Sequence, residues 1–365
     1  MHNWPLTKYS EIIAAVREFD EHKYAGTRNF IDGNVSYLSP YISRGCISTK
    51  VVFLEIIKKN PKAVKEKFVQ ELLWRDYFQR LLQAKPDLHQ VPIREAKNKI
   101  SNDEMPEAVY NATTGIVAID KAILTLYESG YMHNHNRMYV AAVCCNIGKY
   151  AFQKPAKWLY YNLLDADIAS NFASWQWVAG HLTWKTYIAN QENINRYSRE
   201  VQEGSFLDKT YEELEHMDVP PVLSKDINPH LHTNLPTTKI PMLDENPVLL
   251  YTFYNMDPEW HSDKNYNRVL IFEPSHFGEY PVSEKVLNFT LELSENIAGI
   301  QIFSGEFSEL TTAYPHNQFI VKEHPILTFA DATVEERDWI VPEVTGYFQS
   351  FSKYFLKCLP YLNAE

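Results

Sequence analysis

Apolar residues recur mainly at helical spacing in the first 200 residues. They lie three or four positions apart within 12–19, 51–57, 68–82 and 116–127, a spacing typical of amphipathic helices. Ser48 and Thr49 before the second segment, and Gly130 after the fourth, are residue types that begin and end helices. No alternation of apolar and polar residues of comparable length occurs there. The pattern predicts an all-helical domain over residues 1–200.

The pattern changes twice after residue 200. Between 201 and 246 several prolines lie among polar residues, which predicts an extended connection; they are Pro220, Pro221, Pro229, Pro236 and Pro241. Continuous apolar runs follow at 248–253, 269–272, 300–303 and 319–321, with a helical pattern at 283–293 between the second and third. Strands separated by a helix indicate a βαβ unit and a small, mostly parallel sheet. We therefore expect an α/β domain over 247–365 that ends in a helix at about 345–358, and an α+β multidomain fold class.

Composition is that of a soluble globular protein. The 365 residues, 22% of them charged and 45% hydrophobic, suggest about two domains. No apolar run approaches the roughly 18 residues of a membrane span, so we expect no membrane partner and a cytoplasmic location. Cys46, Cys144, Cys145 and Cys358 show no CxxC spacing, which favours free thiols over a disulfide framework and predicts no metal site.

Charge is distributed unevenly along the chain. Residues 1–200 contain 25 Lys and Arg against 20 Asp and Glu, whereas residues 201–365 contain 10 against 26. The first part could therefore face a polyanion such as DNA, and the second part could not.

Acids, an amide and indoles are unusually dense between residues 165 and 177. Asp165, Asp167, Asn171, Trp175 and Trp177 lie there between apolar positions, which is costly unless polar groups satisfy them. A large polar aromatic cofactor would do so.

A second polar segment lies upstream. On a helix, Asn134, Arg137 and Met138 would share one face. Arg137 and Asp165 are a natural pair between two helices, since a guanidinium and a carboxylate hold each other in register. From these residues alone, an interhelical salt bridge within an aromatic core is the favoured interpretation.

Four ordered blocks resemble the DNA photolyase and cryptochrome family. They are the Leu-Ser-Pro loop within 36–45, the Glu-Leu-Leu-Trp-Arg segment at 71–75, the Gly-Tyr-Met-His-Asn segment at 130–138 and the Asp-x-Asp…Asn…Trp-Gln-Trp segment at 165–177. Tyr24 and Arg28 stand upstream at matching spacing. The resemblance implies a photolyase-type, all-helical FAD-binding domain over residues 1–200.

The resemblance also implies which residues hold FAD. Tyr24 and the segment Ser36, Tyr37, Leu38 and Ser39 would hold the phosphates and the ribityl chain, and the hydroxyls and amides of a turn that opens a helix suit a pyrophosphate. Asp165, Ala166 and Asp167 would contact the isoalloxazine and adjacent atoms, with Arg137 paired to Asp165.

Asn171 would lie near flavin N5. There its carbonyl can accept a hydrogen bond from a protonated N5 and favour reduced flavin. Animal cryptochromes place Cys at this position and plant ones Asp, so Asn171 favours photolyase-type chemistry.

A pocket for a flipped cyclobutane pyrimidine dimer in DNA follows from the same resemblance. Two indoles would stack on the bases, a carboxylate and an amide would meet base edges, and cations would meet phosphate; the residues are Arg28, Glu71, Trp74, Arg75, Asn134, His135, Met138 and Trp177. Glu71, Asn134, Met138, Asn171 and Trp175 would serve catalysis, with Trp175 as the immediate electron donor to oxidised flavin. Enzymes for 6-4 photoproducts have His at the positions of Asn134 and Met138, so the cyclobutane dimer is favoured. For Trp74 and Trp177 the alternative is core packing.

Three departures from the family pattern bear on function. His135 replaces an expected Arg, which removes a permanent cation from the DNA-facing surface. Phe152 stands where the photoreduction relay usually has its middle Trp. The α/β antenna domain that begins photolyases is missing from the start of the chain, and the strand–helix–strand order after residue 268 resembles it, which suggests a circular permutation.

The implied function is light-driven, FAD-dependent repair of pyrimidine dimers. The alternative is a non-catalytic flavin photoreceptor or interaction protein with a protein partner. The second, antenna chromophore stays unknown at this point.

Overall fold

The computed structural model describes residues 4–95, 100–183 and 185–362. Its contacts divide the chain into two compact units, which are treated separately. Unit 1 comprises residues 1–22, 36–83 and 232–365, and unit 2 comprises residues 23–35 and 84–231.

Unit 2 is helical. Its main helices are α7 (Val117–Ser129), α8 (Asn134–Ala142), α9 (Gln153–Asn162), α10 (Ile168–Ala179) and α11 (Gln191–Ser198), with shorter α6 (Glu107–Tyr110) and α12 (Tyr211–His216). α10 packs against both α8 and α9. β1 (Met105–Pro106) pairs with β2 (Asp226–Ile227) antiparallel. The predicted helix near 116–127 is confirmed as α7, and Gly130 ends it in the left-handed conformation with φ of 73°.

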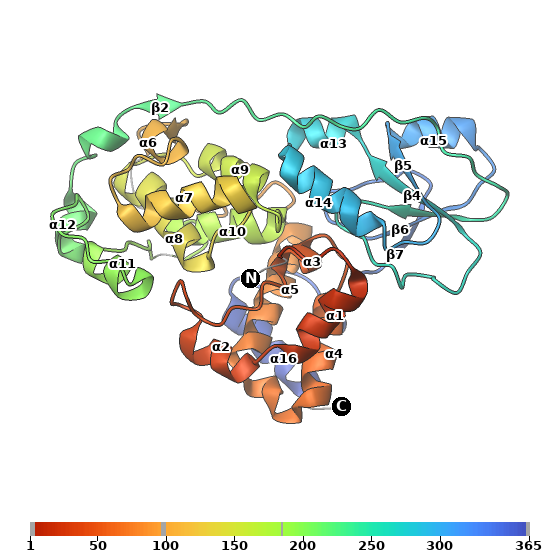
Figure 1. Ribbon diagram of the computed structural model, residues 1–365, viewed down its shortest axis with the longest axis horizontal. Coiled ribbons are helices and arrows are strands. Elements are labelled where there is room, and N and C mark those ends of the chain that lie inside the picture. The colour runs from red at the N-terminus through yellow and green to blue at the C-terminus, as the bar shows by residue number, and fades with distance from the viewer. Residues whose placement is uncertain (1–3, 96–99, 184, 363–365) are drawn as a thin grey trace. The chain divides into compact units, whose positions relative to one another are not determined.

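Unit 1 joins a parallel sheet to helices from both ends of the chain. The helices include α1 (Tyr9–Glu18), α3 (Ser39–Ser43), α4 (Thr49–Lys59), α5 (Lys67–Ala84), α13 (Pro274–Glu279), α14 (Glu284–Ser294), α15 (Phe307–Ala313) and α16 (Phe351–Leu362), while α2 (Glu21–Thr27) begins in unit 1 and ends in unit 2. α4 and α5 confirm predicted helices, and the side chain of Ser48 accepts a hydrogen bond from the amide of Val51 as the cap of α4. α1 packs on α4. α5 contacts both α4, through the Thr49–Asp76 hydrogen bond, and α16, through the Trp74–Phe351 stack (Figure 1).

The sheet confirms the predicted parallel α/β arrangement. Its strands are β3 (Val248–Tyr251), β4 (Asn267–Phe272), β5 (Ile300–Ser304), β6 (Phe319–Lys322) and β7 (Thr333–Glu335). They lie in the order β5-β4-β3-β6-β7 with every ladder parallel. α14 is the crossover between β4 and β5, so the predicted βαβ unit is present. One face of the sheet packs on Phe307 and Leu310 of α15.

Three sequence expectations differ from the structure. The last helix begins at Phe351 and not near 345, because Gly346 has φ of +88°, which no α-helix contains. The short edge strand β7 was not expected, since most of it is exposed and it has no apolar run. The 201–246 connection includes α12 and β2, although residues 228–243 carry neither helix nor strand.

The compact units also differ from the domains predicted over residues 1–200, 201–246 and 247–365. They differ because one face of α5 packs on the segment around residues 337–340. The amide of Ile340 donates to Asp76 at 3.0 Å, Arg337 donates to Gln79 at 2.7 Å, and the guanidinium of Arg80 lies 3.6 Å from the ring centre of Trp339. N-terminal and C-terminal residues therefore share one core.

Asp76 gives this core a pH dependence. Its carboxylate is buried, accepting hydrogen bonds from Thr49 and Ile340, and burial raises its pKa from 3.8 to about 6. Because the pKa of Asp76 is higher in the folded than in the unfolded protein, the protonated carboxyl favours the folded state. This contribution to stability is complete below about pH 4 and is lost as the pH rises through about 6. Relative to Asp76→Asn, we expect the natural protein to lose about 1–3 kcal/mol of unfolding free energy between pH 4 and 7. Urea unfolding at several pH values measures this, and parallel pH profiles for the two proteins would contradict it.

Among the described residues, no helix has both the length and the apolar character needed to cross a membrane. The four cysteines are buried and free, as expected. No group of acids, His and Cys in the described ranges is arranged to hold a metal ion.

Candidate functional site

The predicted site residues divide between the two units. Unit 2 holds Tyr24, Arg28, the 134–138 segment and the 165–177 segment, whereas unit 1 holds the 36–39 segment and the 71–75 segment. Each group is described within its own unit.

The predicted ion pair between α8 and the segment before α10 is present. The Arg137 guanidinium lies 3.0 Å from the Asp165 carboxylate, and its Nε donates to the carbonyl of Met132 at 2.8 Å. Side-chain exposure is 22% for the Arg and 7% for the Asp, so the pair is largely shielded from water. A charge-assisted hydrogen bond in such surroundings fixes both side chains.

Asp167 and Asn171 are oriented by contacts at the start of α10. Asp167 caps the helix, accepting from the amide of Ser170 at 2.7 Å. The Asn171 side-chain nitrogen donates to the carbonyl of Ala156 at 2.8 Å. That bond engages the nitrogen and leaves the amide oxygen as the group for another donor. Ala166 and Trp175 are buried.

Two polar atoms near these residues fit a polar cofactor. The Oγ of Ser170 and the Oδ1 of Asn136 are buried and have no hydrogen-bond partner among the described residues. Buried polar atoms are nearly always paired, so such atoms point to an additional bonding group. FAD offers donors and acceptors for both. Asn136 and Ser170 were not predicted as site residues. The sequence did place each of these polar residues within a helical segment next to the motif residues, which could have indicated them.

The histidines at the start of α8 are neutral at pH 7. His133 caps the helix, its Nδ1 accepting from the amide of His135 at 3.1 Å. Burial lowers the pKa of His133 to about 4, and the nearby guanidinium of Arg137 also lowers it. Burial also lowers the pKa of His135, whose Nδ1 lies 2.7 Å from the carbonyl of Asn29. His135 thus brings α8 to the segment that follows Arg28, and it supplies no cation at neutral pH.

If the chain binds DNA as the resemblance implies, a positive charge at this position should strengthen that binding. We expect His135→Arg to steepen the log–log salt dependence of single-stranded DNA binding by about 0.7, the value for one more phosphate contact on a single strand. Fluorescence anisotropy titrations at several salt concentrations measure this. The control is His216→Arg, the same substitution at an exposed site of α12 in unit 2. An equal change in both variants would mean that position 135 does not face DNA.

The remaining unit 2 residues differ in exposure. Asn134 is exposed, whereas Met138 and Trp177 are half-buried. The Trp177 ring lies 5.9 Å from that of Tyr187. Gln176 is fully buried, with its amide donating to the carbonyls of Leu88 and Val91 and accepting from the amide of Ile93. The middle residue of Trp-Gln-Trp therefore anchors a loop.

The 36–39 segment forms a turn that opens α3. The Ser36 hydroxyl accepts from the amide of Leu38 at 3.3 Å, and Tyr37 takes φ of 54°. α3 has only five residues, so its helix dipole is small. The hydroxyls of Ser36 and Ser39 are the features that suit phosphate here.

On α5, Glu71, Trp74 and Arg75 all have partners within unit 1. Glu71 pairs with Lys67 at 3.2 Å, and Arg75 donates to the Ser43 hydroxyl. Trp74 is half-buried, and its indole stacks on Phe351 of α16 with a centroid distance of 4.0 Å and an interplanar angle of 11°. Phe351 was missed because no local pattern connects it with α5.

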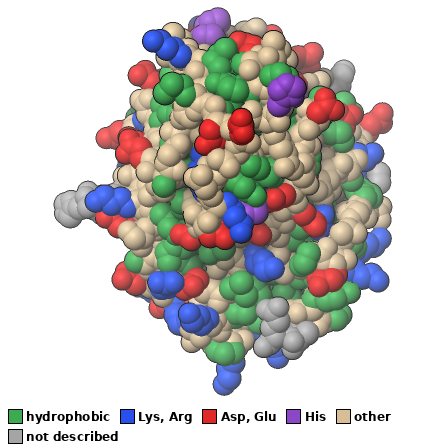
Figure 2. Space-filling model, turned by 90° about the vertical axis from the view of Figure 1, so that its right-hand side faces the viewer, with side chains coloured by type: hydrophobic (Ala, Val, Ile, Leu, Met, Phe, Trp, Pro, Cys, Tyr) green, Lys and Arg blue, Asp and Glu red, His purple; other side chains and the backbone are tan. Residues whose placement is uncertain are grey.

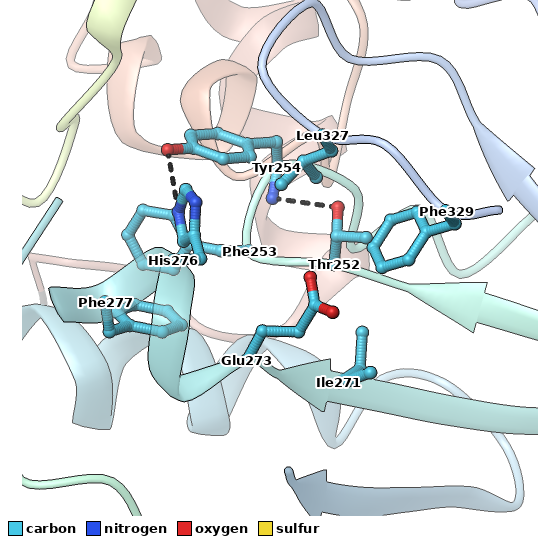
Figure 3. A pocket seen from close by; sticks show the side chains of 9 residues that line it. All are labelled: Thr252, Phe253, Tyr254, Ile271, Glu273, His276, Phe277, Leu327 and Phe329. Atoms are coloured by element: carbon cyan, nitrogen blue, oxygen red, sulfur yellow. Dashed lines mark hydrogen bonds between the residues drawn. The ribbon is translucent and has the colours of Figure 1, made fainter. Parts of the chain in front are cut away.

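A narrow pocket lies where strands β3 and β4 end (Figure 3). The carboxylate of Glu273 points toward it, and Tyr254 lies above with its hydroxyl 3.2 Å from His276 Nε2. Phe253, Phe277, Leu327 and Phe329 form apolar walls, and none of the nine lining residues is glycine. The sequence likewise has no glycine-rich dinucleotide fingerprint after residue 246. The pocket does not identify a second chromophore.

Comparison with known proteins finds similarity over the part of the chain that contains the 134–138 and 165–177 segments. Residues 68–235 match the family described as the FAD binding domain of DNA photolyase. The deoxyribodipyrimidine photo-lyase of Thermus thermophilus is 30% identical over 175 residues, 46% of this chain and 41% of that protein. Cryptochrome DASH of Xenopus laevis is 27% identical over 192 residues, 50% of this chain and 35% of that protein.

Among solved structures, a cryptochrome from Synechocystis sp. PCC6803 is similar with a TM-score of 0.48 and 23% identity, over 52% of this chain and 43% of that one. This chain spans less than half the length of the curated relatives named above. What the comparisons show is that residues 68–235 are similar to the FAD-binding domain of DNA photolyase.

Proposed function

We propose that this protein binds FAD and uses light to repair cyclobutane pyrimidine dimers in DNA. The observation that carries the proposal is the shielded Arg137–Asp165 pair beside the capped start of α10, inside a segment that matches the photolyase FAD-binding domain. Relatives of this segment include proteins named deoxyribodipyrimidine photo-lyase.

The residues proposed to contact the flavin ring are polar groups that unit 2 orients on its own. Asp165 accepts from the cofactor while its ion pair with Arg137 fixes the carboxylate in place, and Asn171 presents its amide oxygen because its nitrogen donates to the carbonyl of Ala156. Ala166 and Asp167 lie alongside, and Asn136 and Ser170 supply further polar atoms. Tyr24 and the 36–39 segment bind the phosphate side.

The proposed lesion site uses aromatic and polar side chains that keep some exposure. Trp74 and Trp177 stack on the bases, Glu71 and Asn134 bond to base edges, and Met138 packs against the ring. Arg28 and Arg75 meet phosphate. Bound FAD supplies light-driven donation of one electron, the chemistry that opens a cyclobutane ring. The protein residues hold the dimer and exclude water, and no side-chain nucleophile is required.

A flavin photoreceptor without repair activity is the second candidate. It is favoured by the neutral His135, by Phe152 and by the acidic C-terminal part of the sequence. Figure 2 shows acidic side chains spread over much of one face, with Lys and Arg mainly toward its lower end. The relatives also include a cryptochrome. We also propose that the α/β domain over residues 247–365 is antenna-like. Such a domain is compatible with either function.

The deciding experiment illuminates the purified, chemically reduced protein with single-stranded DNA that contains thymine dimers. Restored thymine, measured by chromatography against a dark control, would support repair. Tight dimer binding with no repair, or no discrimination of dimers but a light-dependent change of shape, would support the photoreceptor.

A further inference from the structure

We propose that Phe351 is a positioning residue of the DNA site, because it fixes the indole of Trp74 as a flat platform for a base. This inference rests on the proposed function, in which Trp74 stacks on the lesion. It assigns a role to the C-terminal helix α16, which lies beyond the matched family domain that ends at residue 235.

The stack between the two rings is close and nearly parallel. The ring centroids are 4.0 Å apart and the planes differ by 11°. Tyr77 and Phe78, the other rings around Trp74, meet it at 79° and 46°. Only Phe351 among these neighbours therefore covers a face of the indole, and Trp74 still keeps partial exposure.

Contacts on both sides of Phe351 hold it in place. The Tyr77 hydroxyl donates to the carbonyl of Phe348 at 3.2 Å, and the Tyr77 ring lies 5.9 Å from that of Tyr354. Tyr354, Cys358 and Leu362 form the buried stripe of α16. Phe351 therefore belongs to a helix that is packed firmly in place. Its ring restricts rotation of the Trp74 indole before any ligand binds.

A fixed indole favours binding for an entropic reason. Ordering a side chain during association costs free energy, and preorganisation removes that cost. A stacked aromatic pair also contributes beyond its buried area. We therefore expect Phe351→Ala to weaken binding of dimer-containing single-stranded DNA by about 3- to 10-fold.

The test measures dark binding of a thymine-dimer oligonucleotide and its undamaged counterpart by fluorescence anisotropy. Phe351→Ala should weaken dimer binding, leave undamaged-DNA binding and FAD content unchanged, and be rescued by Phe351→Tyr. Leu356→Ala is the matched control, since this side chain belongs to the same helix but is 64% exposed, and it should leave dimer binding unchanged. In the Trp74→Ala background, Phe351→Ala should add no further loss, because it acts through Trp74.

Each contrary outcome is distinct. Unchanged dimer binding in Phe351→Ala, or a loss that adds fully to that of Trp74→Ala, would overturn the positioning role. Tighter dimer binding would also overturn it, since Phe351 would then compete with the base. If the natural protein itself does not prefer dimers, the proposed function fails and this inference with it.

Discussion

Asp165→Ala should leave a folded protein that loses its FAD on purification. The substitution removes the acceptor that we propose for the cofactor and leaves the half-buried Arg137 without its carboxylate. Each effect costs about 1–3 kcal/mol, so FAD affinity should fall at least about tenfold. The ratio of flavin to protein absorbance after gel filtration measures the loss.

Two controls separate charge from folding. Asp165→Asn keeps an acceptor without the charge and should retain an intermediate amount of FAD. Glu200→Ala breaks an ion pair with Lys121 in the same unit, where the lysine side chain is 64% exposed, and should change nothing because exposed pairs contribute little. Stoichiometric FAD in folded Asp165→Ala would show that this carboxylate is not part of the flavin site.

Local periodicity predicted most elements of the fold. The amphipathic segments became α4, α5 and α7, and four continuous apolar runs became β3 to β6 in a parallel sheet. These succeed because burial of one helix face or of a whole strand leaves a direct trace in the sequence. β7 escaped because an exposed edge strand of three residues leaves none.

Long-range packing could not be predicted in the same way. The polar residues Asp76, Gln79 and Arg80 on α5 gave no sign that they would bind a segment around residue 340, since either partner alone resembles a solvated surface. Their pairing decides which residues form unit 1.

The candidate site shows the same contrast. The Arg137–Asp165 pair could be predicted because opposite charges lay in two neighbouring helical patterns, and the structure confirms the contact. Its use for flavin binding stays a prediction. The stacking of Phe351 on Trp74 could not be predicted, because it depends on how the chain returns from the sheet to α5.

Photoreduction of oxidised flavin requires electrons to travel from the protein surface through aromatic side chains. Trp175 on α10 is almost fully buried, and so is Phe152, which precedes α9. Phe is hard to oxidise, so a relay through position 152 should be interrupted. Trp158 is also buried, and its Nε1 donates to the Tyr127 hydroxyl at 3.0 Å. Tyr127 is 36% exposed and donates to the carbonyl of Tyr110 at 2.5 Å, so this pair of oxidisable rings reaches the surface, where solvent can take the tyrosine proton.

We therefore expect slow photoreduction of oxidised flavin in the natural protein, faster photoreduction in Phe152→Trp, and at least about a tenfold decrease in Trp175→Phe, equivalent to about 1.4 kcal/mol of added barrier. Tyr127→Phe should slow the remaining reaction if electrons enter through Trp158. Absorbance under blue light with an external reductant measures these rates. Repair assayed with chemically reduced flavin should be unchanged in all three variants, because it needs the lesion site and not the relay. Efficient photoreduction that persists in Trp175→Phe would mean that electrons reach the flavin by a route that does not include α10.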